Sequence, residues 1–299
     1  MWKNCLAKSL SIIGEDLNKK VPTQKNAFFC SFLPSELARP RDIYYFVTEY
    51  QLSTKARPRA KFLATTSYSM LNLLDFPEKD RVEIIPHEIP AYFYSVKYKV
   101  EMSSNITAIK KKKRTLDEMD KQYLLFVSDA QSRKNPKQWK EVFSHVRRKL
   151  VAVVPKHMFN AFPKDTVLYE FGALSTKDML NLYSHAIATV VLSGGEGFGL
   201  PAVEGAFSYA PPVGNYYEVL SEIFPNDYIR RHFSKGVLRE STGFIPNAKY
   251  IYYEINNPLE VAQLLNNAPD MSKDEIETLS DYIEKYYGVM TQYKRFLFT

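Results

Sequence analysis

The stretch SGGEGFGLPAVE, residues 193–204, follows directly on the apolar run IATVVL, residues 187–192. It contains four of the 11 glycines in a chain of 299 residues. Gly197 and Gly199 have no Cβ atom, so the backbone at these positions can come close to a ligand. Pro201 is typical of the first turn of a helix. The stretch therefore predicts a strand, a glycine-rich loop that faces a ligand, and a helix.

Two glutamates in this stretch indicate the chemistry of the ligand. A helix that begins near Leu200 presents free N–H groups and the positive end of its dipole, which suit a phosphate group. Glu196 and Glu204 are poor phosphate ligands, but carboxylates accept hydrogen bonds from sugar hydroxyls. The pattern favours a ligand made of a sugar, a diphosphate and a ribose. The alternative is a glycine-rich turn with a capping glutamate and no ligand.

The chain from residue 123 onward alternates apolar segments with amphipathic ones. Short strands separated by helices are typical of βαβ units and a parallel sheet. Ligands bind such sheets beyond the carboxyl ends of the strands. We therefore expect the loops 128–135, 170–175 and 193–201 to converge on one site. The expected strands are YLLFVS (123–128), VAVVP (151–155), VLYEF (167–171) and IATVVL (187–192).

Three helix starts are predicted from capping patterns. Asn135 before Pro136 predicts the first, since asparagine is a good N-cap and proline suits the first helical position. Capping-box patterns at Ser175 with Asp178 and at Ser272 with Glu275 predict the other two. The last helix has an apolar stripe made of Ile276, Leu279, Ile283, Tyr286, Met290 and Tyr293.

The first hundred residues repeat the α/β pattern more weakly, and a polar, lysine-rich segment follows them. Strand candidates lie at 26–33, 42–50, 61–67 and 82–86. We expect a first domain over residues 1–95, a basic linker or insertion over 96–121, and a second domain over 122–271. The helix over 272–299 is expected to pack back on the first domain.

The composition excludes several classes of protein. Apolar residues make up 45% and charged residues 24% of the chain, as in a globular protein. Cys5 and Cys30 are too few cysteines for a disulfide scaffold. The chain has no apolar run of about 18 residues, and its start has no long apolar core, so we expect neither a membrane span nor a signal peptide. A cytoplasmic location is the resulting expectation.

The chain is basic, with a net charge of +7 and the run KKKKR at residues 110–114. A basic surface attracts nucleotides, nucleic acid and anionic lipid without distinguishing among them. Weak contact with an anionic membrane surface is therefore one expectation, and contact with nucleic acid is a less favoured one.

Three segments carry a resemblance to a known family. YSHAIATVVLSGGEGFGLPAVEGAFSYAPPV (183–213) resembles the donor-site signature of family 4 glycosyltransferases, with its Glu-x7-Glu element. LLFVSDAQSRKNP (124–136) resembles the first strand and phosphate loop of their donor domain. KFLATTSYSMLNLLDFPEKDRVEIIPHEI (61–89) resembles the end of their acceptor domain. The resemblance extends over residues 40–270 and implies the GT-B fold, in which two Rossmann-like α/β domains face each other across a cleft.

The resemblance implies a catalytic role for three residues. Lys134 would stabilise the negative charge that builds on the leaving diphosphate. Glu49 stands where the family commonly has a histidine, and it is either a polar contact to the sugar or an ordinary acid at a strand end. Glu196 is the third of these catalytic residues. The donor sugar would be held by Glu196 and by the backbone of Gly197, Phe198 and Gly199.

The resemblance also implies contacts to the nucleotide. Leu200 and the helix start would face the diphosphate, and Glu204 would bind the ribose. Phe171 and Gly172 lie where the family lines its nucleobase pocket. The donor would be a UDP- or GDP-sugar, with no further cofactor. Because the chain has no Asp-x-Asp motif, the reaction is expected to need no metal ion.

The chain departs from the family pattern at several points. Asp129 stands where the family has an arginine in the phosphate loop, and the nearby Arg133 would compensate for the lost positive charge. The first domain is also shorter than in the family, and it lacks the glycine-rich loop near its start.

The leading hypothesis is a retaining glycosyltransferase that moves a hexose from a nucleotide-diphosphate sugar to a glycan, lipid or protein acceptor. A transferase that modifies nucleic acid is an alternative, motivated by the charge of +7 and the lysine run. A non-catalytic nucleotide-sugar-binding protein is a second alternative, motivated by Asp129 and the short first domain.

Overall fold

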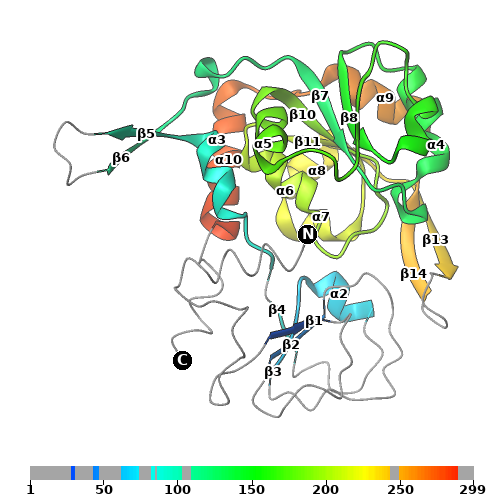
Figure 1. Ribbon diagram of the computed structural model, residues 1–299. Helices are drawn as coiled ribbons and strands as arrows, with labels where there is room; N and C mark the ends of the chain where they lie inside the picture. Colours follow the sequence, from blue (N-terminus) through cyan, green and yellow to red (C-terminus); the bar gives the residue numbers. More distant parts are fainter. Residues whose placement is uncertain are drawn as a thin grey trace. The chain divides into compact units, whose positions relative to one another are not determined.

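The computed structural model describes residues 28–30, 43–46, 62–73, 82–84, 86–102, 109–242 and 249–288 (Figure 1). The chain divides into two compact units. Unit 1 consists of Met1–Ala91, Glu240–Ile251 and Tyr287–Thr299, and unit 2 of Tyr92–Arg239 and Tyr252–Tyr286. The domain boundaries expected from the sequence stay a prediction.

Unit 1 contains a four-stranded sheet in the order β1-β2-β3-β4. Every neighbouring pair is parallel, so each connection must cross over the sheet. All four strands fall where the apolar segments predicted them, while Glu49 lies outside the described residues. The elements are β1 (Phe28–Cys30), β2 (Ile43–Phe46), β3 (Phe62–Thr65), α2 (Tyr68–Leu73) and β4 (Val82–Ile84).

Unit 2 contains a six-stranded parallel sheet in the order β12-β11-β10-β7-β8-β9. The four predicted strands of this region are confirmed, and β11 and β12 extend the sheet. The order reverses at β7, because the chain first adds β8 and β9 on one side and then adds β10 to β12 on the other. The strands are β7 (Tyr123–Val127), β8 (Leu150–Val154), β9 (Val167–Glu170), β10 (Ala186–Val191), β11 (Pro212–Asn215) and β12 (Phe233–Ser234).

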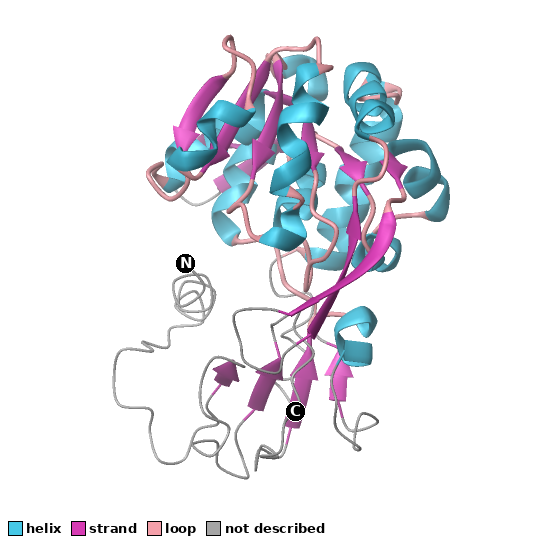
Figure 2. Ribbon diagram, turned by 90° about the vertical axis from the view of Figure 1, so that its right-hand side faces the viewer, coloured by secondary structure: helices cyan, strands magenta, loops and turns pink. Residues whose placement is uncertain are grey.

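Helices cover both faces of this sheet (Figure 1, Figure 2). Trp139 and Phe143 of α4 are fully buried against Phe126 of β7, with the Phe126 and Trp139 rings edge to face at 4.8 Å. Thr189 of β10 points the other way and lies against Gly205 of α6. This alternation is what a strand buried on both faces requires. The helices are α4 (Pro136–Ser144), α5 (Thr176–His185), α6 (Leu200–Phe207), α7 (Glu218–Ile223), α8 (Asn226–His232), α9 (Pro258–Asn267) and α10 (Lys273–Tyr287).

Shorter elements complete unit 2 and its connections. Among the residues that the structure describes, no helix combines the length and the apolarity that a membrane crossing needs. The shorter elements are η3 (Ala91–Phe93), α3 (Tyr94–Lys97), β5 (Tyr98–Met102), β6 (Ile109–Lys113), η4 (Leu116–Glu118), η5 (Ser132–Lys134), η6 (Lys156–Ala161), β13 (Val237–Thr242) and β14 (Lys249–Glu254).

The predicted helix caps have mixed outcomes. Ser175 and Asp178 form the expected capping box at the start of α5. Ser272 and Glu275 also exchange hydrogen bonds, since each backbone N–H donates to the other side chain. The helix start predicted at Asn135 and Pro136 is confirmed, since α4 begins at Pro136, but the Asn135 side chain makes no capping hydrogen bond and its backbone is left-handed with φ +56°. Its amide is used elsewhere, as described below.

Helix α10 confirms most of its predicted stripe. Ile276, Leu279 and Ile283 are buried, whereas Tyr286 is 42% exposed and Tyr287 takes the inward position. Met290 and Tyr293 lie outside the described residues.

The lysine run of the expected linker forms a strand. Strand β6 pairs antiparallel with β5, which makes a two-stranded hairpin. Lys113, at the base of the hairpin, donates to both carboxylate oxygens of Asp281 in α10, at 2.7 and 2.6 Å. Lys97 is fully buried and lies 2.7 Å from both Asp281 Oδ1 and Glu284 Oε2. Part of the basic character of this segment therefore serves to attach it to α10.

Candidate functional site

The candidate site lies at the carboxyl ends of β7 and β10. These two strands are neighbours, and the strand order reverses between them. Their outgoing connections therefore leave toward opposite sides, which opens a crevice in which open α/β sheets bind ligands. The loop after β7 carries Arg133 and Lys134, and the loop after β10 is the glycine-rich stretch.

Backbone hydrogen bonds fasten the two loops to each other. Gly194 donates its N–H to the Arg133 carbonyl at 2.8 Å, and its own carbonyl accepts from Tyr253 N at 2.8 Å. The buried Asn135 amide donates to the carbonyls of Leu192, at 2.8 Å, and Tyr253, at 3.0 Å. Asparagine tolerates the left-handed backbone that this placement needs. The Asn135 side chain thus braces the site instead of capping α4.

An ion pair joins the charged groups of the two loops. The Lys134 ammonium donates to Glu196 Oε1, and Arg133 Nη2 lies 3.8 Å from Glu196 Oε2. The three side chains are only 8 to 12% exposed. Burial alone would raise the pKa of the Glu196 carboxyl, but the positive charges of Lys134 and Arg133 hold that pKa below its ordinary value. Glu196 is therefore ionised at neutral pH.

A small cavity of about 20 Å³ lies beside this ion pair. Its volume is close to that of one water molecule. Lys134, Glu196, Gly199, Ser128 and the fully buried Tyr217 contribute to its lining. Burial and the Glu196 charge both raise the pKa of the Tyr217 hydroxyl, which keeps it protonated and able to donate. Tyr217 was not predicted as a site residue, because no strand was expected at β11 (Pro212–Asn215), the strand that it follows.

The start of α6 supplies the third part of the site. Gly199 precedes the helix with φ +82°, a conformation that favours glycine. A Cβ atom at this position would lie 1.8 Å from the Tyr217 hydroxyl. Leu200 is the first helical residue, as predicted, while the Phe198 side chain is buried and Gly197 is buried too. The start of α6 thus adjoins the Lys134–Glu196 pair, and the N–H groups of Ala202 and Val203 in its first turn donate to the Gly199 carbonyl at 3.0 and 3.3 Å.

Glu204 lies apart from this cavity. Its Oε2 accepts a hydrogen bond of 2.9 Å from Tyr183 of α5, and Glu204 is not among the residues that line the cavity. Burial raises the pKa of Glu204 to about 7, against the opposing effect of the Tyr183 hydroxyl. The ribose contact expected for Glu204 stays a prediction.

We expect Glu204→Gln to change how stability depends on pH. Because burial raises the pKa of Glu204 from about 4.5 to about 7, the folded protein holds this proton more tightly than the unfolded chain does between these pH values. The unfolding free energy contributed by Glu204 therefore falls as pH rises through that window. Between pH 4.5 and pH 8, urea unfolding should show the wild type losing on the order of 3 kcal/mol more than Glu204→Gln. Equal pH slopes for the two proteins would contradict this, and Glu141→Gln on the exposed face of α4 is the control.

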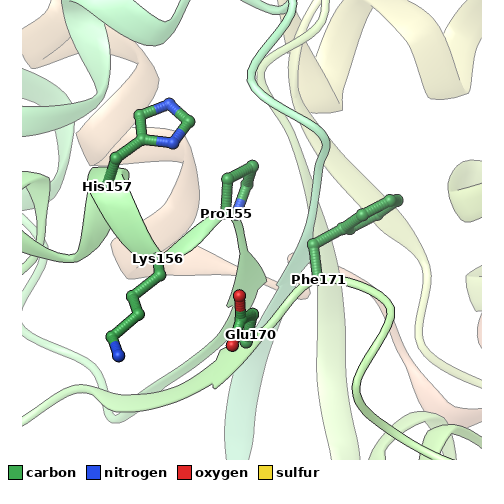
Figure 3. Close-up of a pocket in the computed structure, with 5 residues that line it drawn as sticks. All are labelled: Pro155, Lys156, His157, Glu170 and Phe171. Carbon is green, nitrogen blue, oxygen red and sulfur yellow. The ribbon is translucent and has the colours of Figure 1, made fainter.

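A second hollow lies at the carboxyl ends of β8 and β9. It has a volume of about 570 Å³ and is lined by Pro155, Lys156, His157, Glu170 and Phe171 (Figure 3). Phe171 was predicted for a nucleobase pocket, and the residue is 38% exposed. Gly172 turns the chain directly after it with φ +87° and is not part of the lining. Lys156, His157 and Glu170 were not among the predicted site residues, although Glu170 begins the loop 170–175 that was expected at the site and Lys156 follows a predicted strand.

The remaining candidates are placed as follows. Asp129 accepts a hydrogen bond of 2.7 Å from the side chain of Gln131 in its own loop. Within the described ranges, histidine, cysteine, aspartate and glutamate side chains nowhere gather in a group of three that would suit a metal ion. Metal independence stays a prediction. The structure thus brings Glu196, Lys134, Arg133 and the start of α6 together.

The sequence matches no protein-family model and no curated protein. Solved structures do match. One of an S. aureus TarM mutant with fondaparinux, alpha-GlcNAc-glycerol and UDP has 12% sequence identity and a TM-score of 0.54, covering 86% of this chain and 50% of that one. HepE of Anabaena with UDP and glucose has 11% identity and a TM-score of 0.55, covering 85% and 70%. AviGT4, a glycosyltransferase involved in avilamycin A biosynthesis, has 15% identity and a TM-score of 0.56, covering 92% and 74%.

These similarities concern the fold. The chain has the α/β fold of GT-B glycosyltransferases, with a parallel six-stranded sheet flanked by helices. It spans half the length of the TarM chains that it matches. The expected fold class is confirmed, whereas membership of family 4 and the retaining mechanism stay predictions.

Proposed function

We propose that this chain is a glycosyltransferase that uses a nucleotide-diphosphate sugar as donor and retains the anomeric configuration. The observation that carries the proposal is the buried Lys134–Glu196 pair beside the N-terminus of α6, at the point where the strand order reverses. A cation and a helix start suit a diphosphate, and a carboxylate suits sugar hydroxyls. UDP accompanies TarM and HepE in their structures, which supports a donor of this class.

In the proposed reaction the bond between the anomeric carbon and the diphosphate breaks, and its electron pair leaves with the diphosphate. Lys134, Arg133 and the positive end of the α6 dipole would stabilise this charge in a site with little water. Glu196 would hold the sugar through its hydroxyls. The acceptor oxygen forms the new bond to the anomeric carbon and gives up its proton to the oxygen of the leaving diphosphate. A glycan, lipid or protein acceptor is proposed, with a hexose as the transferred sugar.

The two alternatives lose part of their support. The lysine run motivated a nucleic-acid substrate, but Lys113 of that run is paired with Asp281. The charge of Asp129 motivated the hypothesis of a non-catalytic binding protein, but this carboxylate accepts a hydrogen bond from Gln131 in its own loop. Peripheral contact with an anionic membrane surface remains part of the proposal, since the rest of the lysine run lies in the hairpin.

The proposed function is tested by donor turnover. Wild type and Glu196→Ala are incubated with UDP- and GDP-sugars, with and without EDTA, and the release of nucleoside diphosphate is measured. The wild type should release it with at least one donor in the presence of EDTA, and Glu196→Ala should be at least about 100-fold slower. If the wild type binds a nucleotide sugar but turns over none of them, with or without added acceptors, the protein is a binding protein and not an enzyme.

A further inference from the structure

The hollow at the ends of β8 and β9 has a chemically distinctive lining. The exposed Phe171 ring offers an aromatic surface, and the Glu170 carboxylate offers two acceptor oxygens. Figure 3 shows Lys156 and His157 extending on one side of Pro155 and Phe171 on the other. A lining of this kind combines a surface for stacking with polar groups that can read the edge of a flat ring.

The polar groups of the hollow are available for a ligand. In the part of the chain that the structure describes, the side chains of Glu170, Lys156 and His157 make no hydrogen bond or ion pair with other residues. Strand β9 fixes the backbone of Glu170 through its register with β8, in which Glu170 pairs with Val154.

The hollow is also at a suitable separation from the phosphate-binding groups. Strand β9 is two strands away from β7, whose outgoing loop carries Lys134. Neighbouring strands are about 4.8 Å apart, so the two strand ends are separated by roughly 10 Å along the same edge of the sheet. A ribose and an α-phosphate can bridge such a gap.

We propose that this hollow selects guanine, so that the donor is a GDP-sugar and Glu170 is the residue that determines the base. The inference rests on the proposed function. Guanine presents two adjacent donors, N1–H and the 2-amino group, which match the two oxygens of one carboxylate. Lys156 and His157 add donors that suit its O6 and N7 acceptors.

The other common bases fit this lining less well. Uracil presents a single N3–H between two carbonyl oxygens, and these oxygens would be repelled by the Glu170 carboxylate. Adenine and cytosine each present an amino group beside a ring nitrogen that is an acceptor, so only one carboxylate oxygen finds a donor. The predicted order of affinity therefore places GDP first.

The test is a set of calorimetric titrations with GDP, UDP, ADP, CDP and inosine diphosphate, which is GDP without the 2-amino group. In the wild type, GDP should bind at least about 10-fold more tightly than UDP and several-fold more tightly than inosine diphosphate, as the loss of a charge-assisted hydrogen bond implies. In Glu170→Ala the five affinities should agree within about threefold. Glu141→Gln, which removes an exposed carboxylate from α4, should keep the wild-type order.

The results of these titrations distinguish the guanine inference from the proposed function. UDP binding as tightly as GDP, or a GDP preference that survives in Glu170→Ala, would overturn the guanine inference and leave the proposed function standing. If none of the five nucleotides binds, and inorganic pyrophosphate does not bind either, both proposals fail. Because Glu170 is exposed, its replacement should leave the thermal unfolding midpoint unchanged, which the same samples can confirm.

Discussion

Replacing Glu196 by glutamine is expected to lower donor turnover by at least about 100-fold while it raises the affinity for the free nucleoside diphosphate several-fold. In the structure the Lys134 ammonium is held by the Glu196 carboxylate. A diphosphate must compete with that carboxylate for the same ammonium and is repelled by its charge. Glutamine removes both effects, but it also loses the charged acceptor for the sugar hydroxyls.

Lys134→Met should act in the opposite direction on nucleotide binding. The loss of a charge-assisted contact to the diphosphate is expected to weaken GDP or UDP binding by about 10- to 100-fold. The test is that the two substitutions change the affinity for the nucleoside diphosphate in opposite directions, because a loss of folded protein would lower the affinity in both variants. Calorimetric titration of wild type, Glu196→Gln and Lys134→Met with the nucleoside diphosphate measures both. An affinity that falls in Glu196→Gln would contradict the proposed competition.

The free energy of unfolding provides the control for the Glu196→Gln and Lys134→Met variants. Removing one member of a buried ion pair leaves the other charge buried and costs about 3 to 5 kcal/mol. Arg133 also approaches Glu196, so Lys134→Met should be near the lower end of that range. The double variant Lys134→Met with Glu196→Gln carries neither charge of the pair and should regain part of the lost unfolding free energy, while the buried Arg133 charge loses the nearby Glu196 carboxylate. It should still turn over no donor, which separates the catalytic role from the structural one.

The sheet of unit 2 could be predicted from the sequence because each strand is a short run of apolar residues. Strands β7, β8 and β10 are buried on both faces, so their sequences are continuously apolar and easily recognised. Strand β9 is only partly buried but keeps enough apolar character to be found. The position of the glycine-rich loop then followed, since it comes directly after β10.

The contacts that the sequence did not indicate have a common physical origin. Asn135 and Pro136 correctly predict the start of α4, yet the Asn135 amide bonds to carbonyls 57 and 118 residues away in the chain instead of capping the helix. Local patterns carry no information on such partners. The same holds for the pairing of Lys113 with Asp281, which a run of lysines does not suggest.

The candidate site was predictable to the extent that it depends on strand ends. Lys134 and Glu196 lie 62 residues apart, but parallel strands bring their loops to one edge of the sheet. What the sequence could not show is that the two charges neutralise each other. Nor could it show that Glu204 is bonded to Tyr183, because this contact depends on the packing of α5 against α6.

Gly194→Ala is expected to be the most damaging single substitution of a glycine in the site. An added Cβ atom would lie 2.0 Å from the carbonyl oxygen of Tyr253 and 2.7 Å from its carbonyl carbon and nitrogen. These are backbone atoms, and no side-chain rotation can relieve the contact. Either β14 or the loop must move, which breaks the hydrogen bonds from Tyr253 N to Gly194 and from Gly194 N to Arg133.

The expected cost of Gly194→Ala is about 3 kcal/mol, at the upper end for an overpacked site, and a fall in thermal midpoint of roughly 6 to 12 °C. Nucleoside diphosphate binding should be lost as well, since the broken bonds hold the Lys134 and Glu196 loops together. Gly172→Ala is the matched control: its φ of +87° disfavours alanine, but an added Cβ atom meets nothing within 4 Å. That variant should lose only about 1 kcal/mol. If both variants unfold at the same temperature, the contact with Tyr253 is not what requires glycine at position 194.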